Sequence, residues 1–171
     1  MHFFRLCARG AVLTLMLVSL TSCGGDAGAG PFDGSLFMKL RVDGTLYEYS
    51  LAGGLLAAFA GGGTNYNLSI SGNDAGATFV VLQAFDTAPV TTGTYTGFTI
   101  TTGVEGALMT FHDPSGVDYD VDVGIPGTVA TITITEISAN QVAGTFTATL
   151  GATGHANVSV TEGSFRVARA N

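Results

Sequence analysis

The residues best suited to chemistry lie in one short segment, His112 to Gly124 (HDPSGVDYDVDVG). Asp118, Asp120 and Asp122 alternate with Tyr and Val, so an extended strand would place the three carboxylates on one face. Carboxylates held close together repel one another, and they favour either solvent or a cation. Because calcium binds about six to eight oxygen atoms, these aspartates form a candidate calcium site with Asp113 and nearby backbone carbonyls.

The calcium-binding loop of the EF-hand does not fit this segment. If Asp118 takes the first position, Val123 stands at the invariant glycine and Val129 at the bidentate glutamate. Side chains on one face of a strand are also about 7 Å apart, which is wide for ligands of a single ion. The alternative interpretation is an acidic outer face that keeps a strand soluble and blocks edge-to-edge pairing. Calcium binding is therefore an alternative function, and no other cofactor is predicted.

Catalysis finds little support in the sequence. A nucleophilic triad needs a Ser or Cys with a His base and an orienting carboxylate, and neither His112 nor His155 belongs to such a motif. The glycine-rich stretch GGLLAAFAGGG lacks the Lys and Ser or Thr of a phosphate-binding loop. The chain is predicted not to be an enzyme, and an envelope hydrolase with loop-borne residues is kept as a further alternative.

The start of the chain is typical of an export signal. Arg5 and Arg9 come before the apolar stretch Ala11 to Leu20 (AVLTLMLVSL), and no acidic residue lies among them. A stable membrane-spanning helix needs about 20 apolar residues, so this shorter stretch is better explained as a signal peptide that is removed. Cys7 would leave with it, and no disulfide is then expected in the remaining chain.

Cys23 follows the apolar stretch directly. Leu20, Thr21, Ser22 and Cys23 match, position for position, the lipobox of bacterial lipoproteins, and the chain resembles that class. The resemblance implies that residues 1–22 are removed and that the Cys23 sulfur carries a diacylglyceryl group, which with further acylation gives a durable membrane anchor. The alternative is an ordinary secreted protein with a free thiol.

The resemblance also implies a location and a domain plan. In a Gram-negative host, Gly24 stands where some lipoproteins retained in the inner membrane have Asp, so the outer membrane is the expected site. Residues 23–34, with the glycine-rich run Gly24 to Gly34, are expected to form a flexible tether. Residues 35–171 are then expected to fold as a single β-sandwich domain.

Charge limits the range of partners. The chain has 6 Lys and Arg residues against 13 Asp and Glu residues, for a formal net charge of −7. Two of the six cations lie in the predicted signal, so the remaining chain is more acidic still. Such a chain repels phosphate backbones, which excludes nucleic acid as a partner and leaves the membrane, an envelope protein or a glycan.

The elements that must position these residues are strands. After Gly34 apolar residues recur with a period of two, and glycine-rich turns separate the segments, which predicts an all-β antiparallel sandwich or flattened barrel of about nine to eleven short strands. Asp43 and Gly44 predict a type I′ hairpin turn that pairs Leu40 with Tyr47 and Met38 with Tyr49. The same register places Lys39 opposite Glu48.

Later segments extend this prediction. Residues 77–85 are apolar on both faces and predict a central strand, whereas residues 128–137, 141–150 and 156–167 predict a final antiparallel meander. A change of apolar phase in the last strand predicts a bulge at Glu162 and Gly163. Burial favours a hairpin around His112 in which Phe111 pairs with Val117.

Several short motifs, among them VDG, GTY, TITIT, AGTF and EGSF, resemble those of small all-β domains in bacterial envelope lipoproteins. The resemblance covers most of residues 36–167 and implies fold and location, but it carries no functional residue across. The sequence therefore favours a lipid-anchored, non-catalytic binding or structural module of the cell envelope.

Overall fold

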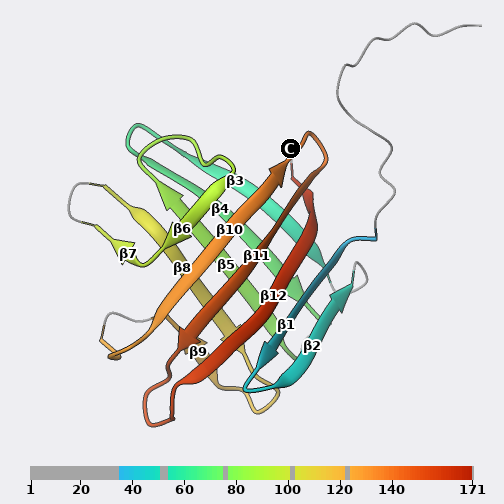
Figure 1. Cartoon of the computed structure of the whole chain (residues 1–171), viewed down its shortest axis with the longest axis vertical. Helices are drawn as coiled ribbons and strands as arrows, with labels where there is room; N and C mark the ends of the chain where they lie inside the picture. The colour runs from blue at the N-terminus through green and yellow to red at the C-terminus, as the bar shows by residue number, and fades with distance from the viewer. Residues whose placement is uncertain (1–34, 51–53, 75–76, 101–102, 122–123, 171) are drawn as a thin grey trace, which may run out of the picture.

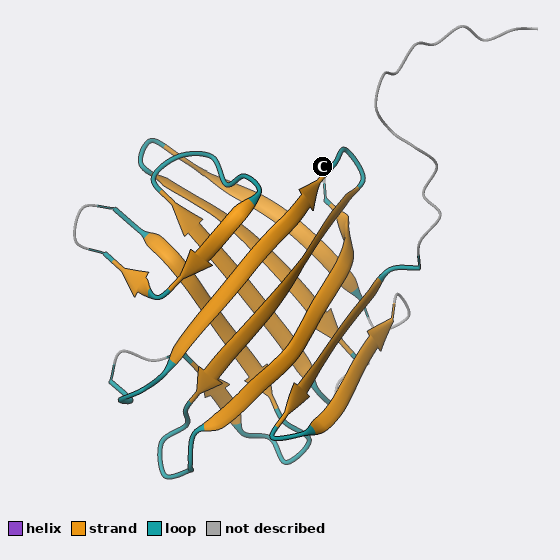
Figure 2. Cartoon of the chain, in the orientation of Figure 1, coloured by secondary structure: helices purple, strands orange, loops and turns teal. Residues whose placement is uncertain are grey.

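The computed structural model describes residues 35–50, 54–74, 77–100, 103–121 and 124–170. Cys23, the lipobox, the signal segment and the tether lie outside the described residues. Within the described part every regular element is a strand, which confirms the all-β prediction (Figure 2). The strands are β1 (Phe37–Val42), β2 (Thr45–Ser50), β3 (Leu55–Gly62), β4 (Asn65–Asn73), β5 (Phe79–Asp86), β6 (Gly93–Thr96), β7 (Phe98–Thr99), β8 (Glu105–His112), β9 (Asp118–Asp120), β10 (Val129–Ile137), β11 (Gln141–Leu150) and β12 (Val158–Arg169).

These twelve strands slightly exceed the nine to eleven expected, and β7 and β9 have only two and three residues. They form one mostly antiparallel sheet that curls into two layers, as in a β-sandwich or flattened barrel (Figure 1). The front layer in Figure 1 contains β6, β10, β11, β12, β1 and β2, and behind it run β3, β4, β5 and β8. No helix in the described ranges has the length and apolar character needed to cross a bilayer.

The layers are joined at two places where a segment changes partners. The end of β12 pairs in parallel with β3, through Ala168 and Leu56, so the sheet is not purely antiparallel as expected. On the other side, the Gly97 N–H donates to the Ala130 carbonyl of β10, and the Gly97 carbonyl accepts from Ala107 of β8. The β6–β7 segment therefore passes from the front layer to the back layer.

One hydrophobic core fills the space between the layers. Alternate residues of the central strands are fully buried, among them Leu68 and Ile70 in β4, Leu82 in β5, and Ile132 in β10. The predicted position of a central strand near residues 77–85 is confirmed, because β5 lies between β4 and β8. The expected cover on both of its faces is wrong, since only alternate residues of β5 are buried. The intervening residues face outward, so each strand has one buried and one solvent-facing side.

The first hairpin has the predicted register. Leu40 pairs with Tyr47 and Met38 with Tyr49, and the turn residues Asp43 and Gly44 have φ angles of 46° and 83°. Tyr49 is buried in the core, with 2% of its surface exposed. Its hydroxyl accepts a hydrogen bond from Thr78 Oγ1 at 3.0 Å, and burial raises the pKa of Tyr49 to about 12.

The final meander is confirmed and explains the AGTF and EGSF motifs. β11 and β12 are antiparallel, so Gly144 lies opposite Phe165 and Phe146 lies opposite Gly163. Each phenyl ring covers the glycine of the other strand, since a Cβ on Gly163 would lie 2.6 Å from the Phe146 ring and a Cβ on Gly144 2.8 Å from the Phe165 ring. Such aromatic–glycine pairs fix the register of neighbouring strands.

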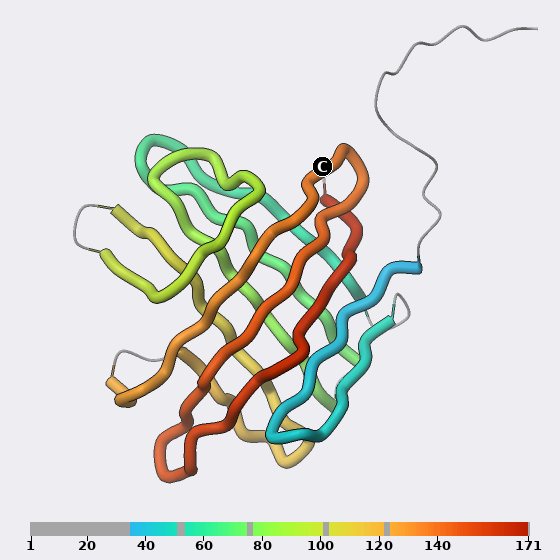
Figure 3. The backbone as a smooth tube through the Cα atoms, in the orientation of Figure 1, coloured from blue at the N-terminus to red at the C-terminus, as the bar shows by residue number. Residues whose placement is uncertain are grey.

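The bulge in β12 is also confirmed. The pairing of β12 with both β1 and β11 shifts near Thr161, and Glu162 has a φ angle of 53°. In Figure 3 the blue β1 and the red β12 lie side by side, although they are the first and last strands in the sequence. This pairing sets the surface described below.

Candidate functional site

The acidic segment forms a hairpin at one end of the back layer, and the backbone of Asp120 also pairs with Gly151 just after β11. The Asp113 carboxylate accepts hydrogen bonds from the backbone N–H groups of Ser115 and Val117, at 2.8 and 2.9 Å, and from the Ser115 hydroxyl. The hydrogen bond from the Val117 N–H is the largest reason that the pKa of Asp113 is lowered. Asp113 therefore closes its own loop, with both oxygens engaged.

The two described aspartates of the strand also have partners. His112 Nδ1 and Asp118 Oδ1 are 2.7 Å apart, and Thr110 Oγ1 donates to Asp120. The pairing is Phe111 with Tyr119, so the expected pairing of Phe111 with Val117 is wrong by two residues. The Asp113 cap explains the shift, because it places the five-residue loop at 113–117 and not at 112–116.

The predicted metal ligands are brought close only in part. Asp113, Asp118 and Asp120 belong to one hairpin, but Asp122 lies outside the described residues. Among the residues that the structure describes, no three His, Cys, Asp or Glu side chains are grouped so that they could hold a metal ion. Calcium binding by these residues stays a prediction, and the described contacts give it no support.

The two histidines of the domain pack against aromatic rings. The His112 ring stacks on Phe79 with a centroid distance of 4.8 Å and an interplanar angle of 5°. His155 meets Tyr119 edge to face at 6.0 Å. His112 is the last residue of β8, so the expectation that it is a solvated loop residue is wrong.

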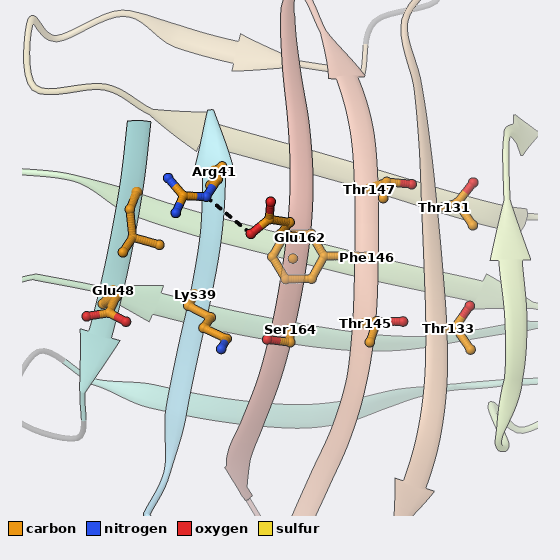
Figure 4. Close-up of a pocket in the computed structure, with 12 residues that line it drawn as sticks. Lys39, Arg41, Glu48, Thr131, Thr133, Thr145, Phe146, Thr147, Glu162 and Ser164 are labelled. Carbon is orange, nitrogen blue, oxygen red and sulfur yellow. Dashed lines mark hydrogen bonds and ion pairs between the residues drawn. The ribbon is translucent and has the colours of Figure 1, made fainter. Parts of the chain in front are cut away.

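A second polar region lies on the outer side of the front layer. Here an open groove of about 640 Å³ crosses β2, β1, β12, β11 and β10, and we call it the outer groove (Figure 4). Hydroxyl groups and four charged side chains make up most of its lining. The lining residues are Lys39, Arg41, Leu46, Glu48, Thr131, Thr133, Thr145, Phe146, Thr147, Glu162, Gly163 and Ser164.

The register of the strands arranges these side chains in two rows. In the first row each residue is the direct cross-strand partner of the next: Glu48, Lys39, Ser164, Thr145, Thr133 and Thr94. In the second row Thr147, Thr131 and Thr96 are likewise successive partners, and Arg41 pairs with Leu46 at the other side of the bulge. Neighbouring strands are about 4.8 Å apart, so the five strands under the groove span about 20 Å.

The bulge and the aromatic–glycine pairs shape the floor of the groove. Gly163 is buried beside the ring of Phe146, and no side chain rises from β12 at that point (Figure 4). The bulge turns Glu162 outward, where its Oε2 lies 3.2 Å from Arg41 Nε. Arg41 Nη1 also donates to the Gly44 carbonyl at 2.9 Å.

The other polar groups of the outer groove are only partly satisfied. The hydroxyls of Thr133 and Thr131 lie 3.0 and 2.8 Å from those of Thr94 and Thr96 and are hydrogen-bonded to them. The described part of the chain has two ion pairs, Arg41 with Glu162 and His112 with Asp118, so Lys39 and Glu48 face each other without one. The predicted pairing of these two residues is confirmed as a register only. Ser164 Oγ is buried and has no hydrogen-bond partner among the described residues.

The outer groove can therefore offer both hydrogen-bond donors and hydrogen-bond acceptors along its length. Its threonine and serine hydroxyls can donate and accept, Lys39 can donate and Glu48 can accept. The groove contains no histidine, cysteine or grouped acids. This chemistry suits the binding of a long polar ligand.

Sequence reasoning missed the outer groove, although a signal was present. The pattern Thr-x-Thr recurs along the chain, and three of its occurrences, at 94–96, 131–133 and 145–147, lie on neighbouring strands of the front layer. Threonine is common in strands for conformational reasons alone, so the repeats do not by themselves indicate a site. No protein-family model, curated protein or solved structure matches the chain, and its function has to be argued from the outer groove itself.

Proposed function

We propose that this protein is a lipid-anchored lipoprotein of the cell envelope, a non-catalytic module whose outer groove binds an extended glycan. The lipobox resemblance at Cys23 supports the anchor, and Gly24 supports an outer-membrane location in a Gram-negative host. The observation that carries the glycan part is the set of cross-strand hydroxyl rows along the groove, where Lys39 and Glu48 make no ion pair within the described residues.

A glycan matches the outer groove in shape and in chemistry. A polysaccharide is extended and presents hydroxyls along its whole length, so it can exchange hydrogen bonds with each threonine in a row. The four charged residues that line the groove are two cations and two anions, which favours a neutral polar polymer over a strongly charged one. Each neutral hydrogen bond contributes only about 1 kcal/mol, so affinity must come from several contacts made together.

The anchor is tested by replacing Cys23 with Ser in the native host. We expect the variant protein to lose acylation and to leave the membrane fraction, because the thiolate that accepts the lipid is gone. Mass spectrometry of the N-terminal peptide and membrane fractionation report these two changes. Unchanged acylation and membrane association in Cys23→Ser would refute the anchor.

The groove is tested with the full chain in a polyoxyethylene detergent, which has no sugar headgroup. The probes are isolated peptidoglycan in a sedimentation assay and soluble neutral polysaccharides in affinity gel electrophoresis. The test variant is Thr145→Val with Thr147→Val, which keeps the branched shape and removes two hydroxyls from the groove. We expect about a thirtyfold loss of affinity for the glycan that binds, because two lost hydrogen bonds amount to about 2 kcal/mol.

Thr149→Val is the matched control. Thr149 lies on the same face of β11 and pairs with Val129 and Ser159, but it does not line the outer groove. The control should bind as the wild type does. Equal binding by the double variant and the wild type, or no binding of any probe by the wild type, would reject the glycan proposal while leaving the anchor untouched.

A further inference from the structure

A second cavity opens at the end of the sandwich where β3, β4, β10 and β12 meet. It is an open depression of about 340 Å³, near the lower end of the range for small-molecule sites, which is about 300 to 1,000 Å³. Apolar and aromatic side chains form much of its wall: Phe59, Tyr66, Pro89, Val90 and Ile137. Arg169, the last residue of β12, is the one charged residue in the lining, and we call the cavity the Arg169 pocket.

Arg169 occupies an inward position. Phe165 and Val167 in the same strand are 1% and 0% exposed and face the core. Arg169, the last residue of β12, follows two positions later and so lies on the same side of the strand. An arginine at such a position is costly unless its charge and its donors are satisfied. Its backbone N–H donates to the Asn140 carbonyl at 2.9 Å, which fixes the point from which the side chain leaves.

The guanidinium group is held in place but only partly satisfied. Its carbon lies 4.7 Å from the centroid of the Phe59 ring, and Nη1 donates to the Ser138 carbonyl at 2.9 Å. Within the described residues it makes no ion pair, and Nε and Nη2 make no hydrogen bond. An oriented guanidinium with free donors is suited to the two oxygens of a carboxylate.

We propose that the Arg169 pocket binds a small amphipathic carboxylate, a ligand with one carboxyl group on an apolar body. The carboxylate accepts hydrogen bonds from the free donors of Arg169, and the apolar body packs against Phe59 and Tyr66. Local charge complementarity supports this ligand, because Arg169 is the one charged residue in the lining of the pocket. The proposal does not depend on glycan binding in the outer groove.

The test uses the purified full chain and two probes, 4-phenylbutanoate and its uncharged analogue 4-phenylbutan-1-ol. Isothermal titration calorimetry or ligand-observed NMR measures the affinity of each. We expect the carboxylate to bind saturably at millimolar concentration or below and at least about tenfold more tightly than the alcohol, because an ionised partner strengthens the hydrogen bonds to Arg169. Equal binding of the two probes, or no saturable binding of the carboxylate, would overturn the proposal.

Variants locate the binding. Arg169→Gln should lose about tenfold or more in affinity for 4-phenylbutanoate and little for the alcohol, whereas Arg169→Lys should fall between Arg169→Gln and the wild type. Arg166→Gln is the control, since it removes the same charge from the outward-facing phase of β12. If Arg169→Gln does not fold, the comparison of Arg169→Lys with the wild type decides. Loss of affinity in Arg166→Gln equal to that in Arg169→Gln would show a general charge effect and contradict the site.

Discussion

The acidic hairpin and the outer groove are both rich in polar side chains, but they differ in how those side chains are satisfied. In the hairpin each described carboxylate has a partner in the same hairpin: Asp113 its own loop, Asp118 His112, and Asp120 Thr110. In the groove Lys39 and Glu48 lack ion pairs within the described part of the chain, and the buried Ser164 hydroxyl lacks a hydrogen bond there. The hairpin uses its carboxylates to hold its own shape. The groove is only partly satisfied, because Thr131 and Thr133 bond to Thr96 and Thr94 while Lys39 and Glu48 make no ion pair within the described residues.

This difference shows why residue type alone is a weak guide to a site. The run of aspartates in the sequence suggests a cation site, yet local hydrogen bonds are the simplest use of these residues. The threonines of the groove look ordinary one strand at a time. They become a surface only when the register aligns them across neighbouring strands.

The largest expected effect is at the floor of the outer groove. In Gly163→Val the new side chain would collide with the carbonyl oxygen and the ring of Phe146, so one of the paired strands must move. We expect a loss of about 3 kcal/mol in the free energy of unfolding, the cost of overpacking a tight site. Urea denaturation followed by circular dichroism measures this.

Ser164→Ala, one residue along, is the control for Gly163→Val. It removes a buried hydroxyl that has no partner among the described residues, so the free energy of unfolding should be unchanged or slightly higher. Should Gly163→Val be as stable as the wild type, the floor of the groove is not rigid.

The next effect tests the hairpin. Asp113→Ala removes the carboxylate that accepts the Ser115 and Val117 N–H groups, and we expect a loss of about 1–2 kcal/mol in stability. Asp113→Asn keeps one acceptor oxygen and should lose less. Thermal denaturation of the three proteins at neutral pH provides the measurement, and a Tm of Asp113→Ala equal to that of the wild type would show that the loop holds without its cap.

The same carboxylate gives a pH dependence with a defined sign. Because the pKa of Asp113 is lowered below its ordinary value of 3.8, the folded state favours the ionised form. Its stabilising contribution is complete above pH 3.8 and is lost as the pH falls through the lowered pKa. The difference in unfolding free energy between the wild type and Asp113→Asn should therefore shrink in this acid range, and a difference that stayed constant would contradict the cap.

A smaller effect is expected from the ion pair in the groove. Arg41 and Glu162 have side chains that are 38% and 72% exposed, so solvent and salt screen their attraction. A double-mutant cycle with Arg41→Gln and Glu162→Gln should give a coupling energy below about 1 kcal/mol, falling further at high salt. A coupling of several kcal/mol would mean that the pair, and not the bulge, fixes the shape of the groove.

The smallest effect is expected for calcium. The hairpin carboxylates described here already have protein partners, and no suitable group of ligands is present within the described ranges. Millimolar calcium should therefore leave the Tm of the wild type and of Asp120→Asn unchanged. A clear rise in the Tm of the wild type alone would revive the calcium site and remove the contrast between the two regions, because a ligand that binds only the folded state stabilises it.

Much of the fold follows from local sequence. The Asp43–Gly44 turn sets the register of the first hairpin, and the change of apolar phase near Glu162 marks the bulge. These features depend on residues close together in the chain, where turn chemistry and alternation act directly. The hairpin after Phe111 was predicted two residues out of register, because burial alone is equally satisfied by a shift of two residues and the Asp113 cap decides between them.

The candidate site was harder to predict than the strands that carry it. The outer groove joins β1 and β2 to β10, β11 and β12, and its ion pair links Arg41 to Glu162 across 121 positions. Alternation predicts which residues face outward, but it does not predict which strands are neighbours. The Arg169 pocket likewise needs the end of β12 beside β3 and β4.

The sequence by itself determined an acidic, strand-built chain with a short meander, a turn at Asp43–Gly44 and a cysteine in lipobox context. The tertiary structure alone decided which outward faces lie together and where β12 changes its pairing partner from β1 to β3. It also decided which polar groups lack a hydrogen bond or ion pair within the described residues. The physical reason is that turn and strand preferences act over a few residues, whereas pairing between distant strands depends on how the whole core packs.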